Sequence, residues 1–362
     1  MIVLDAHQDI AMNALSSGRD YREHTLIKRR REAGSIIEEK AGIATTGLPD
    51  ALIGRIAIVF ATLFVEPRRI QEQYNVPGFS NQTYKTPQEA YSLAMKQMDY
   101  YHRLADEEPR IRLLRRQADL AAVLATWADD QPFEKRLHGM AVLIENGDSI
   151  LEPKQFEEWY ERGVRIVGPA WVASRYCGGT KEPGGLTLLG EELLGVMANL
   201  NAILDLSHMA EQAFLEAVDR YTGEVVIASH SNPRRFVDTD RQLSDDMILR
   251  LADRDGVMGI VPYNNFLSQK WVSGERKVGV PFSLVIDAID HVCQITGSAA
   301  HVGIGSDYDG GFGAASIPEG LDSVSDLIKI ADGLRERGYS TEHIDQIMSG
   351  NFLRKLRQAL PV

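Results

Sequence analysis

The chain has 362 residues, of which 44% are hydrophobic and 25% charged, ordinary values for a soluble globular protein. Its formal net charge of −12 argues against a nucleic-acid-binding protein and against a protein held on membranes by basic residues. The two cysteines, Cys177 and Cys293, are too few for a disulfide framework and form no CxxC motif.

The N-terminus enters an apolar run directly, with no basic start and no small-residue cleavage site, so we expect no secretory signal. The longest apolar stretch, from Ile56 to Val65, is shorter than the ~20 residues that cross a bilayer. We therefore expect a cytoplasmic protein without membrane association.

Eight short apolar runs, rich in valine and isoleucine, recur along the chain. They rarely alternate with polar residues, which is typical of parallel strands that are covered on both faces. In chain order the predicted strands are Ile2–Leu4, Ile56–Phe64, Met140–Ile144, Val164–Val167, Ala202–Leu206, Val225–Ala228, Val257–Val261 and Val302–Ile304.

Helical patterns lie between most of these runs. Thr86-Pro87-Gln88-Glu89 has the form of a capping box that begins one helix. Apolar residues at helical spacing predict further helices over Leu188–Leu200, Met247–Leu251 and Leu284–Val292. The charge run Lys28-Arg29-Arg30-Arg31-Glu32 is interpreted as a solvated helix face rather than an anion-binding patch.

This alternation of strand and helix predicts an α/β fold, a (β/α)8 TIM barrel that forms a single domain over residues 1–362. A doubly wound open sheet is the alternative, which the eight strands and the absence of a linker disfavour. The segments Met12–Leu48 and Glu66–Asp130, after strands 1 and 2, are much longer than the usual connection of about 4–6 residues. We expect these long loops to wall the mouth of the barrel.

In such barrels the chemistry lies at the carboxyl ends of the strands. Five of the eight runs are followed by a histidine or a carboxylate there. The residues concerned are His7, Asp9, Glu145, His208, His230 and Asp307.

Their chemistry suits a pair of metal ions. His7 and Asp9 are two positions apart and therefore point to the same side of a strand, while His208 and His230 end successive strands. Glu145 has two oxygens and can bridge two ions, so the set fits a two-metal hydrolytic site with ions about 3.5–4 Å apart.

Each residue alone has a structural interpretation, because histidines beside strands often only form hydrogen bonds and aspartates often cap turns. Asp307-Tyr308-Asp309-Gly310 also has the form of a calcium-loop fragment, but the rest of that motif is missing. The joint placement of the six residues favours the metal site. The other histidines are interpreted as structural: His24, His102, His138, His291, His301 and His343.

At this point the chain resembles the membrane (renal) dipeptidase family of zinc metallopeptidases, in the amidohydrolase superfamily. The stretches that carry the resemblance occur in family order over nearly the whole chain. They are Asp5-Ala6-His7-Gln8-Asp9, Leu143-Ile144-Glu145-Asn146-Gly147, Gly185-Leu186-Thr187 with Gly190, Leu204-Asp205-Leu206-Ser207-His208, Ala228-Ser229-His230-Ser231, Arg241-Gln242-Leu243-Ser244-Asp245, Tyr263-Asn264-Asn265 and Val302-Gly303-Ile304-Gly305-Ser306-Asp307-Tyr308-Asp309-Gly310.

The resemblance implies a binuclear zinc dipeptidase that uses a metal-bridging hydroxide. Two Zn²⁺ per chain are implied, with His7 and Asp9 on one ion, His208 and His230 on the other, and Glu145 between them. Asp307 is implied to bind the first zinc and to relay protons. Arg241 and Tyr263 fall in stretches that are implied to bind substrate, and a homodimer is a family-level expectation.

The chain departs from the family after the fourth run. Well-studied members have a histidine there that helps to polarise the scissile carbonyl, whereas this chain reads Gly168-Pro169-Ala170-Trp171. We interpret Trp171 as a wall of the substrate pocket. It keeps open an alternative, a related amidohydrolase acting on an N-acyl amino acid or a lactam. A binding protein with a vestigial site is disfavoured, since no metal ligand is lost.

Overall fold

Eight parallel strands close into a barrel in the computed structural model, which describes residues 1–74, 81–272, 277 and 279–362. The first strand pairs with the second on one side and with the last on the other, where Asp5 faces Ile304. The predicted (β/α)8 barrel is therefore confirmed, and the open sheet is wrong. The barrel strands are β1 (Val3–Gln8), β2 (Ile56–Phe64), β6 (His138–Glu145), β7 (Val164–Gly168), β10 (Ile203–Asp205), β11 (Val226–Ala228), β12 (Val257–Ile260) and β13 (Val302–Ile304).

Each predicted apolar run overlaps one barrel strand. The largest difference is at β1, which continues through Asp5, His7 and Gln8, three polar residues that are fully buried. Polar residues end the apolar pattern, but here they remain in the strand, where Asp5 accepts hydrogen bonds from Gln8 and Ser306 and His7 lies beside Glu145. The last residues of β1 therefore belong to the polar cluster that forms the candidate site.

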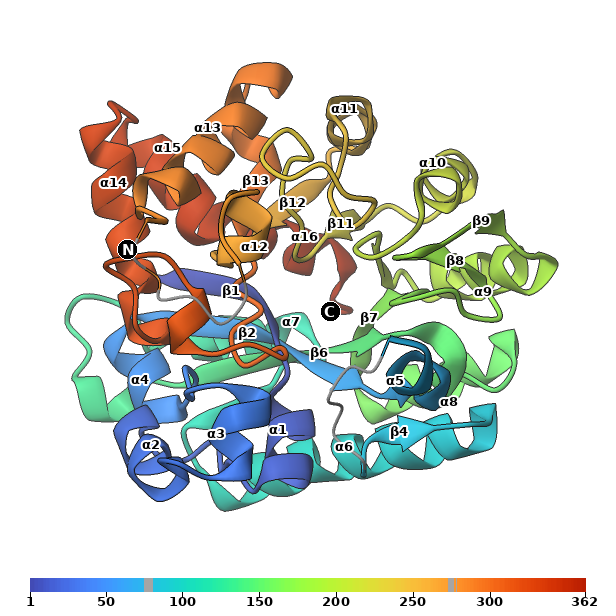
Figure 1. The fold of residues 1–362 in the computed structure, drawn as a ribbon, viewed down its shortest axis with the longest axis horizontal. Coiled ribbons are helices and arrows are strands. Elements are labelled where there is room, and N and C mark those ends of the chain that lie inside the picture. The colour runs from blue at the N-terminus through green and yellow to red at the C-terminus, as the bar shows by residue number, and fades with distance from the viewer. Residues whose placement is uncertain (75–80, 273–276, 278) are drawn as a thin grey trace.

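Helices surround the strands (Figure 1). They bury their apolar faces against the barrel and leave their polar faces to solvent, as α6 does with Ala94, Met98 and Tyr101. The helices are α1 (Ile10–Ser17), α2 (Thr25–Glu32), α3 (Ile36–Ala41), α4 (Leu48–Ile53), α5 (Arg68–Tyr74), α6 (Pro87–Glu107), α7 (Gln117–Ala125), α8 (Phe156–Arg162), α9 (Leu188–Asn199), α10 (Glu211–Arg220), α11 (Asp245–Asp253), α12 (Asn264–Leu267), α13 (Ser283–Thr296), α14 (Ile330–Glu336), α15 (Thr341–Asp345) and α16 (Asn351–Ala359).

The predicted helices correspond to α6, α9, α11 and α13. The capping box before α6 is only half formed. The Thr86 hydroxyl accepts from the Glu89 amide at 3.3 Å, but the Glu89 carboxylate accepts from Lys85 rather than from Thr86. The helix nevertheless begins at Pro87, where the sequence places its start.

The charge run on α2 is the solvated face that its composition indicates only in part. Arg30 and Arg31 are exposed, whereas Lys28 and Glu32 are 1% and 2% exposed because they point inward from α2. Glu32 accepts two hydrogen bonds from the buried Arg19, at 3.0 and 2.8 Å, and Lys28 donates to the Thr46 carbonyl at 2.9 Å. Burial lowers the pKa of Lys28 to about 8.

The first long loop reaches the mouth of the barrel through residues 42–46. There Asp309 accepts hydrogen bonds from the amide and hydroxyl of both Thr45 and Thr46, at 2.7–3.1 Å. The backbones also approach closely, since a Cβ on Gly42 would lie 2.6 Å from the Gly313 nitrogen. Asp309 therefore ties this loop to the end of β13, which is a structural role and not that of a calcium ligand.

Three smaller pairings were not predicted. β5 (Ile111–Leu113) lies beside the beginning of β6, β3 (Glu66–Pro67) pairs with β4 (Thr83–Tyr84), and β8 (Cys177–Gly179) forms a hairpin with β9 (Glu182–Leu186). Across the part of the chain that the structure describes, no helix combines the length and apolarity that a membrane span requires.

Candidate metal centre

The six candidate side chains meet at the carboxyl ends of five strands. All are nearly buried, with Asp307 the most exposed at 15% of its side chain. The Nε2 atom of His7 lies 4.0 Å from Asp9 Oδ1 and 3.7 Å from Asp307 Oδ1. These three groups could surround one ion, as the spacing of His7 and Asp9 predicts.

Glu145 lies between two groups of ligands. Its Oε2 atom is 3.3 Å from the Nε2 atom of His7, and its Oε1 atom is 3.3 and 3.4 Å from the Nε2 atoms of His208 and His230. Each carboxylate oxygen thus faces a different part of the cluster. A carboxylate in this arrangement can contact two ions at once.

The hydrogen bonds behind His230 fix where its proton lies. The Ser229 hydroxyl donates to the Asp205 carboxylate at 2.5 Å, so its oxygen accepts from the Nδ1–H of His230 at 2.8 Å. His208 has a hydroxyl behind it as well, since its Nδ1 atom lies 3.0 Å from Thr180 Oγ1. Both rings can therefore present an unprotonated Nε2 to the cluster.

These two Nε2 atoms are only 3.0 Å apart and share Glu145 Oε1 as a neighbour. Three atoms with lone pairs around one point repel one another unless a cation lies among them. His7 adds to this arrangement, because neither of its fully buried ring nitrogens has a hydrogen-bond partner among the residues that the structure describes. Such unpaired buried nitrogens are costly unless they bind something.

The charges of the cluster also indicate that it binds cations. Burial, together with the charge of Glu145, raises the pKa of Asp9, and burial with Asp9 and Glu145 raises the pKa of Asp307 well above its ordinary value. His7 is also buried, which lowers its pKa, but the nearby carboxylates raise it to about 10. The negative charge of the three carboxylates is not balanced by His7 alone, and protons or divalent cations can supply the missing positive charge.

The backbone is strained at two of the six residues. His208 has φ 65° and Asp307 has φ 56°, in the left-handed region that side chains other than glycine rarely adopt. Such strain costs of order 1–3 kcal/mol and is found mostly where function holds the residue in place. Here it directs both side chains from the strand ends into the cluster.

The sequence patterns missed the residues that hold the cluster in position. Thr62 on β2 donates to Asp9, and Asp5 accepts from the Ser306 amide and hydroxyl at 2.7 and 2.6 Å. On the opposite side of the barrel, Asp205 likewise accepts from the Ser229 amide and hydroxyl, at 2.8 and 2.5 Å. Asp5 lies within β1 and Asp205 ends β10, but nothing in their spacing distinguishes a ligand from a residue that supports one.

The three candidate substrate-binding residues lie around this cluster. Arg241 is buried, donates to the His230 carbonyl at 2.6 Å and to Ser231 Oγ at 3.1 Å, and stacks its guanidinium over Phe266. Among the residues that the structure describes, no ion pair joins Arg241 to Asp245 or Asp246, and Asp245 pairs with His291.

The two aromatic candidates lie on different segments. The Trp171 ring packs edge-on against Phe64 at 5.2 Å and lies 6.2 Å from the ring of His208. Tyr263 stacks on Phe312 at 4.1 Å. Trp171 thus contacts both the end of β2 and a member of the cluster, as a residue at the mouth would.

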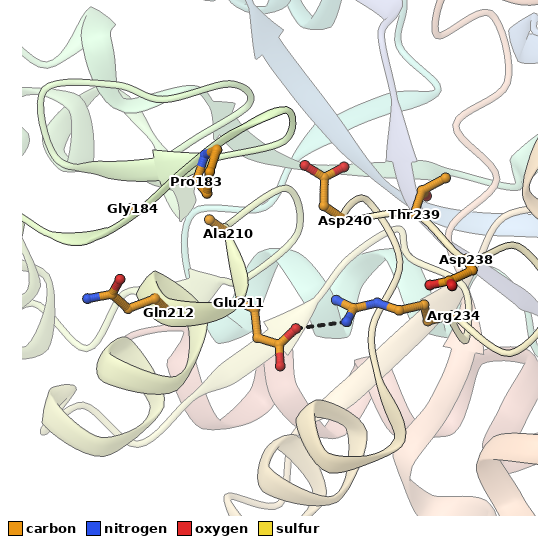
Figure 2. Close-up of a pocket in the computed structure, with 9 residues that line it drawn as sticks. All are labelled: Pro183, Gly184, Ala210, Glu211, Gln212, Arg234, Asp238, Thr239 and Asp240. Carbon is orange, nitrogen blue, oxygen red and sulfur yellow. Dashed lines mark hydrogen bonds and ion pairs between the residues drawn. The ribbon is translucent and has the colours of Figure 1, made fainter.

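A cavity of about 300 Å³ lies between β9 and the loop over residues 238–240 (Figure 2). Its lining includes the ion pair of Glu211 with Arg234, and Asp240, which precedes Arg241. None of the six candidate ligands lines this cavity. It flanks the candidate centre and does not contain it.

With this geometry in view, the model of the membrane dipeptidase family, peptidase family M19, matches residues 1–361. The chain belongs to this family. It is accordingly a metallo-dipeptidase, a hydrolase that acts on peptide bonds, as its resemblance to the family implies.

Individual relatives agree with this family. An uncharacterized dipeptidase of Schizosaccharomyces pombe is 28% identical over 367 residues, which cover 97% of this chain and 79% of that protein. An uncharacterized Klebsiella pneumoniae protein from the pqqA 5′ region is 32% identical over 215 residues, 57% of this chain and 76% of that one. The solved structure of a Rhodobacter sphaeroides metallo peptidase, liganded with a phosphinate mimic of the dipeptide L-Ala-D-Ala, has the same fold, with a TM-score of 0.79, 20% identity and 99% of each chain covered.

Proposed function

We propose that this metallo-dipeptidase holds two zinc ions and cleaves the peptide bond of free dipeptides. The observation that carries the proposal is the position of Glu145, whose two oxygens face His7 on one side and His208 with His230 on the other. His7, Asp9 and Asp307 would hold one ion, and His208 and His230 the other. Nitrogen and carboxylate ligands in this number suit zinc.

The residues present fit these ions on structural grounds. The facing lone pairs of His208 and His230 and the unpaired nitrogens of His7 are explained if cations lie among them. When bound, two divalent ions supply Lewis acidity and lower the pKa of a water that they share to about 7, so that hydroxide is available at neutral pH.

Asp307 would move the proton in this reaction. It is the most exposed of the six side chains, with 15% of its surface accessible. A carboxylate there can accept the proton of the attacking water and deliver it to the nitrogen of the leaving amine. The products are then a carboxylate and a free amine, and Asp307 returns to its starting state.

Arg241 would recognise the carboxylate of the substrate. Its Nε–H has no partner within the described part of the chain, although the guanidinium is held in place by the His230 carbonyl and Ser231. A buried, already oriented cation beside the metal ligands can attract a carboxylate at little cost in side-chain entropy. This selects substrates with a free C-terminus.

Trp171 favours one alternative function. With Phe64 it forms an aromatic surface next to His208, where the family's well-studied members have a histidine that reaches the carbonyl. An apolar wall suits the acyl group of an N-acyl amino acid or the ring of a lactam as well as an amino-acid side chain. The second candidate is therefore an amidohydrolase that acts on such small amides.

One experiment tests both candidates. The zinc-loaded protein is assayed for amine release on a panel of free dipeptides, N-acyl amino acids and lactams, with its metal content measured by elemental analysis. We expect about two zinc ions per chain, dipeptide cleavage above all other activities, and loss of cleavage on chelation that zinc restores. Preference for N-acyl amino acids or lactams would support the second candidate. Full activity in thoroughly demetallated protein would contradict both.

A further inference from the structure

The tip of the β8–β9 hairpin lies against His208. The Thr180 amide donates to the Trp171 carbonyl at 3.1 Å, and Thr180 Oγ1 lies 3.0 Å from His208 Nδ1. The next amide, of Lys181, donates to the Asp240 carboxylate at 2.7 Å. One turn thus contacts three segments that lead to proposed site residues.

The contacts of Thr180 determine which atom carries the proton. Its Oγ1 atom is also 3.4 Å from the carbonyl oxygen of His208, an atom that can only accept. A hydroxyl proton directed at that carbonyl leaves the hydroxyl oxygen to accept from the Nδ1–H of His208. This arrangement favours the tautomer that leaves the lone pair on Nε2, which faces Glu145.

The two neighbouring histidines are supported differently. His230 is held by Ser229 and the buried carboxylate of Asp205, which belong to adjacent barrel strands or their ends. His208 is held by one neutral hydroxyl on a hairpin outside the barrel, and its own backbone is in the left-handed region. The orientation of His208 therefore depends on the hairpin more than that of His230 does.

The hairpin is fixed well enough to hold it. Gly179 forms a bridge with Met209, and the Ala210 amide donates to the Gly178 carbonyl at 3.1 Å, so β8 runs beside the residues that follow His208. A Cβ on Gly179 would lie 2.5 Å from the Val172 carbonyl, which shows how closely the hairpin packs on the Trp171 segment. Thr180 thus occupies a defined position relative to the ring.

We propose that Thr180 is a positioning residue that fixes the tautomer and the direction of His208 for metal binding. The proposal rests on the proposed binuclear centre. Removing the partner of a metal-binding histidine typically weakens metal binding by 10–100-fold. Thr180 acts through His208 and has no direct part in the reaction.

The test compares Thr180→Val, which keeps the shape but removes the hydroxyl, with Thr180→Ser, which keeps the hydroxyl. Zinc is titrated into the demetallated proteins against a coloured chelator, and folding is checked by circular dichroism. We expect one of the two zinc dissociation constants to rise by about 10–100-fold in Thr180→Val, with the other unchanged and Thr180→Ser close to wild type. Wild-type constants in Thr180→Val would overturn the proposal.

Thr187→Val is the matched control. It lies at the other end of the same hairpin, and its hydroxyl bonds to the Arg175 carbonyl and the Gly190 amide, not to a candidate ligand. We expect this variant to lose some stability and to keep both zinc constants. An equal loss of zinc affinity in both variants would mean that Thr180 acts only through the stability of the hairpin.

A second measurement needs no metal. In the demetallated protein, ¹⁵N chemical shifts of the labelled histidines, assigned with a His208→Gln variant, report which ring nitrogen is protonated. We expect the share of His208 that is protonated on Nδ1 to be higher in wild type and in Thr180→Ser than in Thr180→Val. An equal share in these proteins would overturn the proposal, and Thr180→Ala takes the place of Thr180→Val if the valine variant fails to fold. Absence of zinc binding by wild type would instead count against the binuclear centre.

Discussion

Replacing Glu145 with glutamine tests the centre of the cluster with almost no change in shape. Both oxygens of Glu145 are in use, one 3.3 Å from His7 and the other 3.3 and 3.4 Å from His208 and His230. A glutamine amide keeps one oxygen and places an NH₂ donor on the opposite side. The ion on the oxygen side loses a charged partner, and the ion on the NH₂ side faces a group that cannot bind it.

The size of the effect follows from these contacts. A hydrogen bond or ligand contact to a charged group contributes about 1.5–3 kcal/mol, which is roughly 10- to 150-fold in affinity for the ion that keeps an oxygen. The other ion should be lost at ordinary zinc concentrations. We expect Glu145→Gln to bind one zinc tightly instead of two and to lose almost all turnover, measured by elemental analysis and by dipeptide cleavage.

The control for this variant is Glu108→Gln. Glu108 is a partly buried carboxylate that pairs with Arg110, immediately before β5, at the end of the barrel away from the mouth. It should keep both ions and full turnover. Two zinc ions bound with wild-type affinity and normal turnover in Glu145→Gln would refute the bridging role and leave Glu145 as an ordinary strand-end carboxylate.

Three further variants test other parts of the molecule. Arg241→Ala should raise the KM for free dipeptides by about 10- to 150-fold, since a charge-assisted contact contributes about 1.5–3 kcal/mol. The KM for the same dipeptides with an amidated C-terminus should rise much less. An equal rise in KM for both substrates would exclude carboxylate recognition. Trp171→Ala and Trp171→His should change the ranking of side chains in a dipeptide panel with metal content unchanged, and an identical ranking in all three proteins would make Trp171 a packing residue only. Lys28→Met tests the buried lysine through pH: the pKa of Lys28 is about 8 in the folded chain and 10.5 ordinarily, so the unfolded chain holds more protons between these values. The free energy of unfolding of wild type, relative to that of Lys28→Met, should therefore rise by at most about 1.4 kcal/mol per pH unit from pH 8 toward 10. Urea denaturation at several pH values measures this difference. A difference that stays constant with pH would show that the pKa of Lys28 is not depressed.

The barrel could be predicted from the sequence because every barrel strand contains the same feature, a continuous apolar run. Strands covered on both faces must be apolar throughout, and runs such as Val257–Val261 satisfy this without any knowledge of their partners. The candidate ligands could be predicted for a related reason. Parallel strands all end at the same face, so a polar residue such as Glu145, directly after an apolar run, or His208, one residue further on, is directed there by the topology.

The remaining features depend on contacts between distant residues, which no local pattern reveals. Lys28 and Glu32 form part of a strongly charged helix, yet Arg19 and the 42–46 loop bury them. Thr180 follows two glycines in a short hairpin and has no periodicity that separates it from other loop threonines. Its position beside His208 could be recognised only once the fold was known.

The order of the candidate ligands along the chain has a consequence for synthesis. They extend from β1 to the turn after β13, and β1 is the strand on which β13 closes the barrel. A nascent chain that still lacks its last strand has an unpaired edge on β1 and no Asp307, and pairings between the two ends of a chain form late because loop closure must come first. The complete centre therefore cannot assemble while the ribosome is still making the barrel. The candidate ligand set is complete only after β13 and the turn that follows it have been made, and His7 and Asp9 have no Asp307 beside them until then.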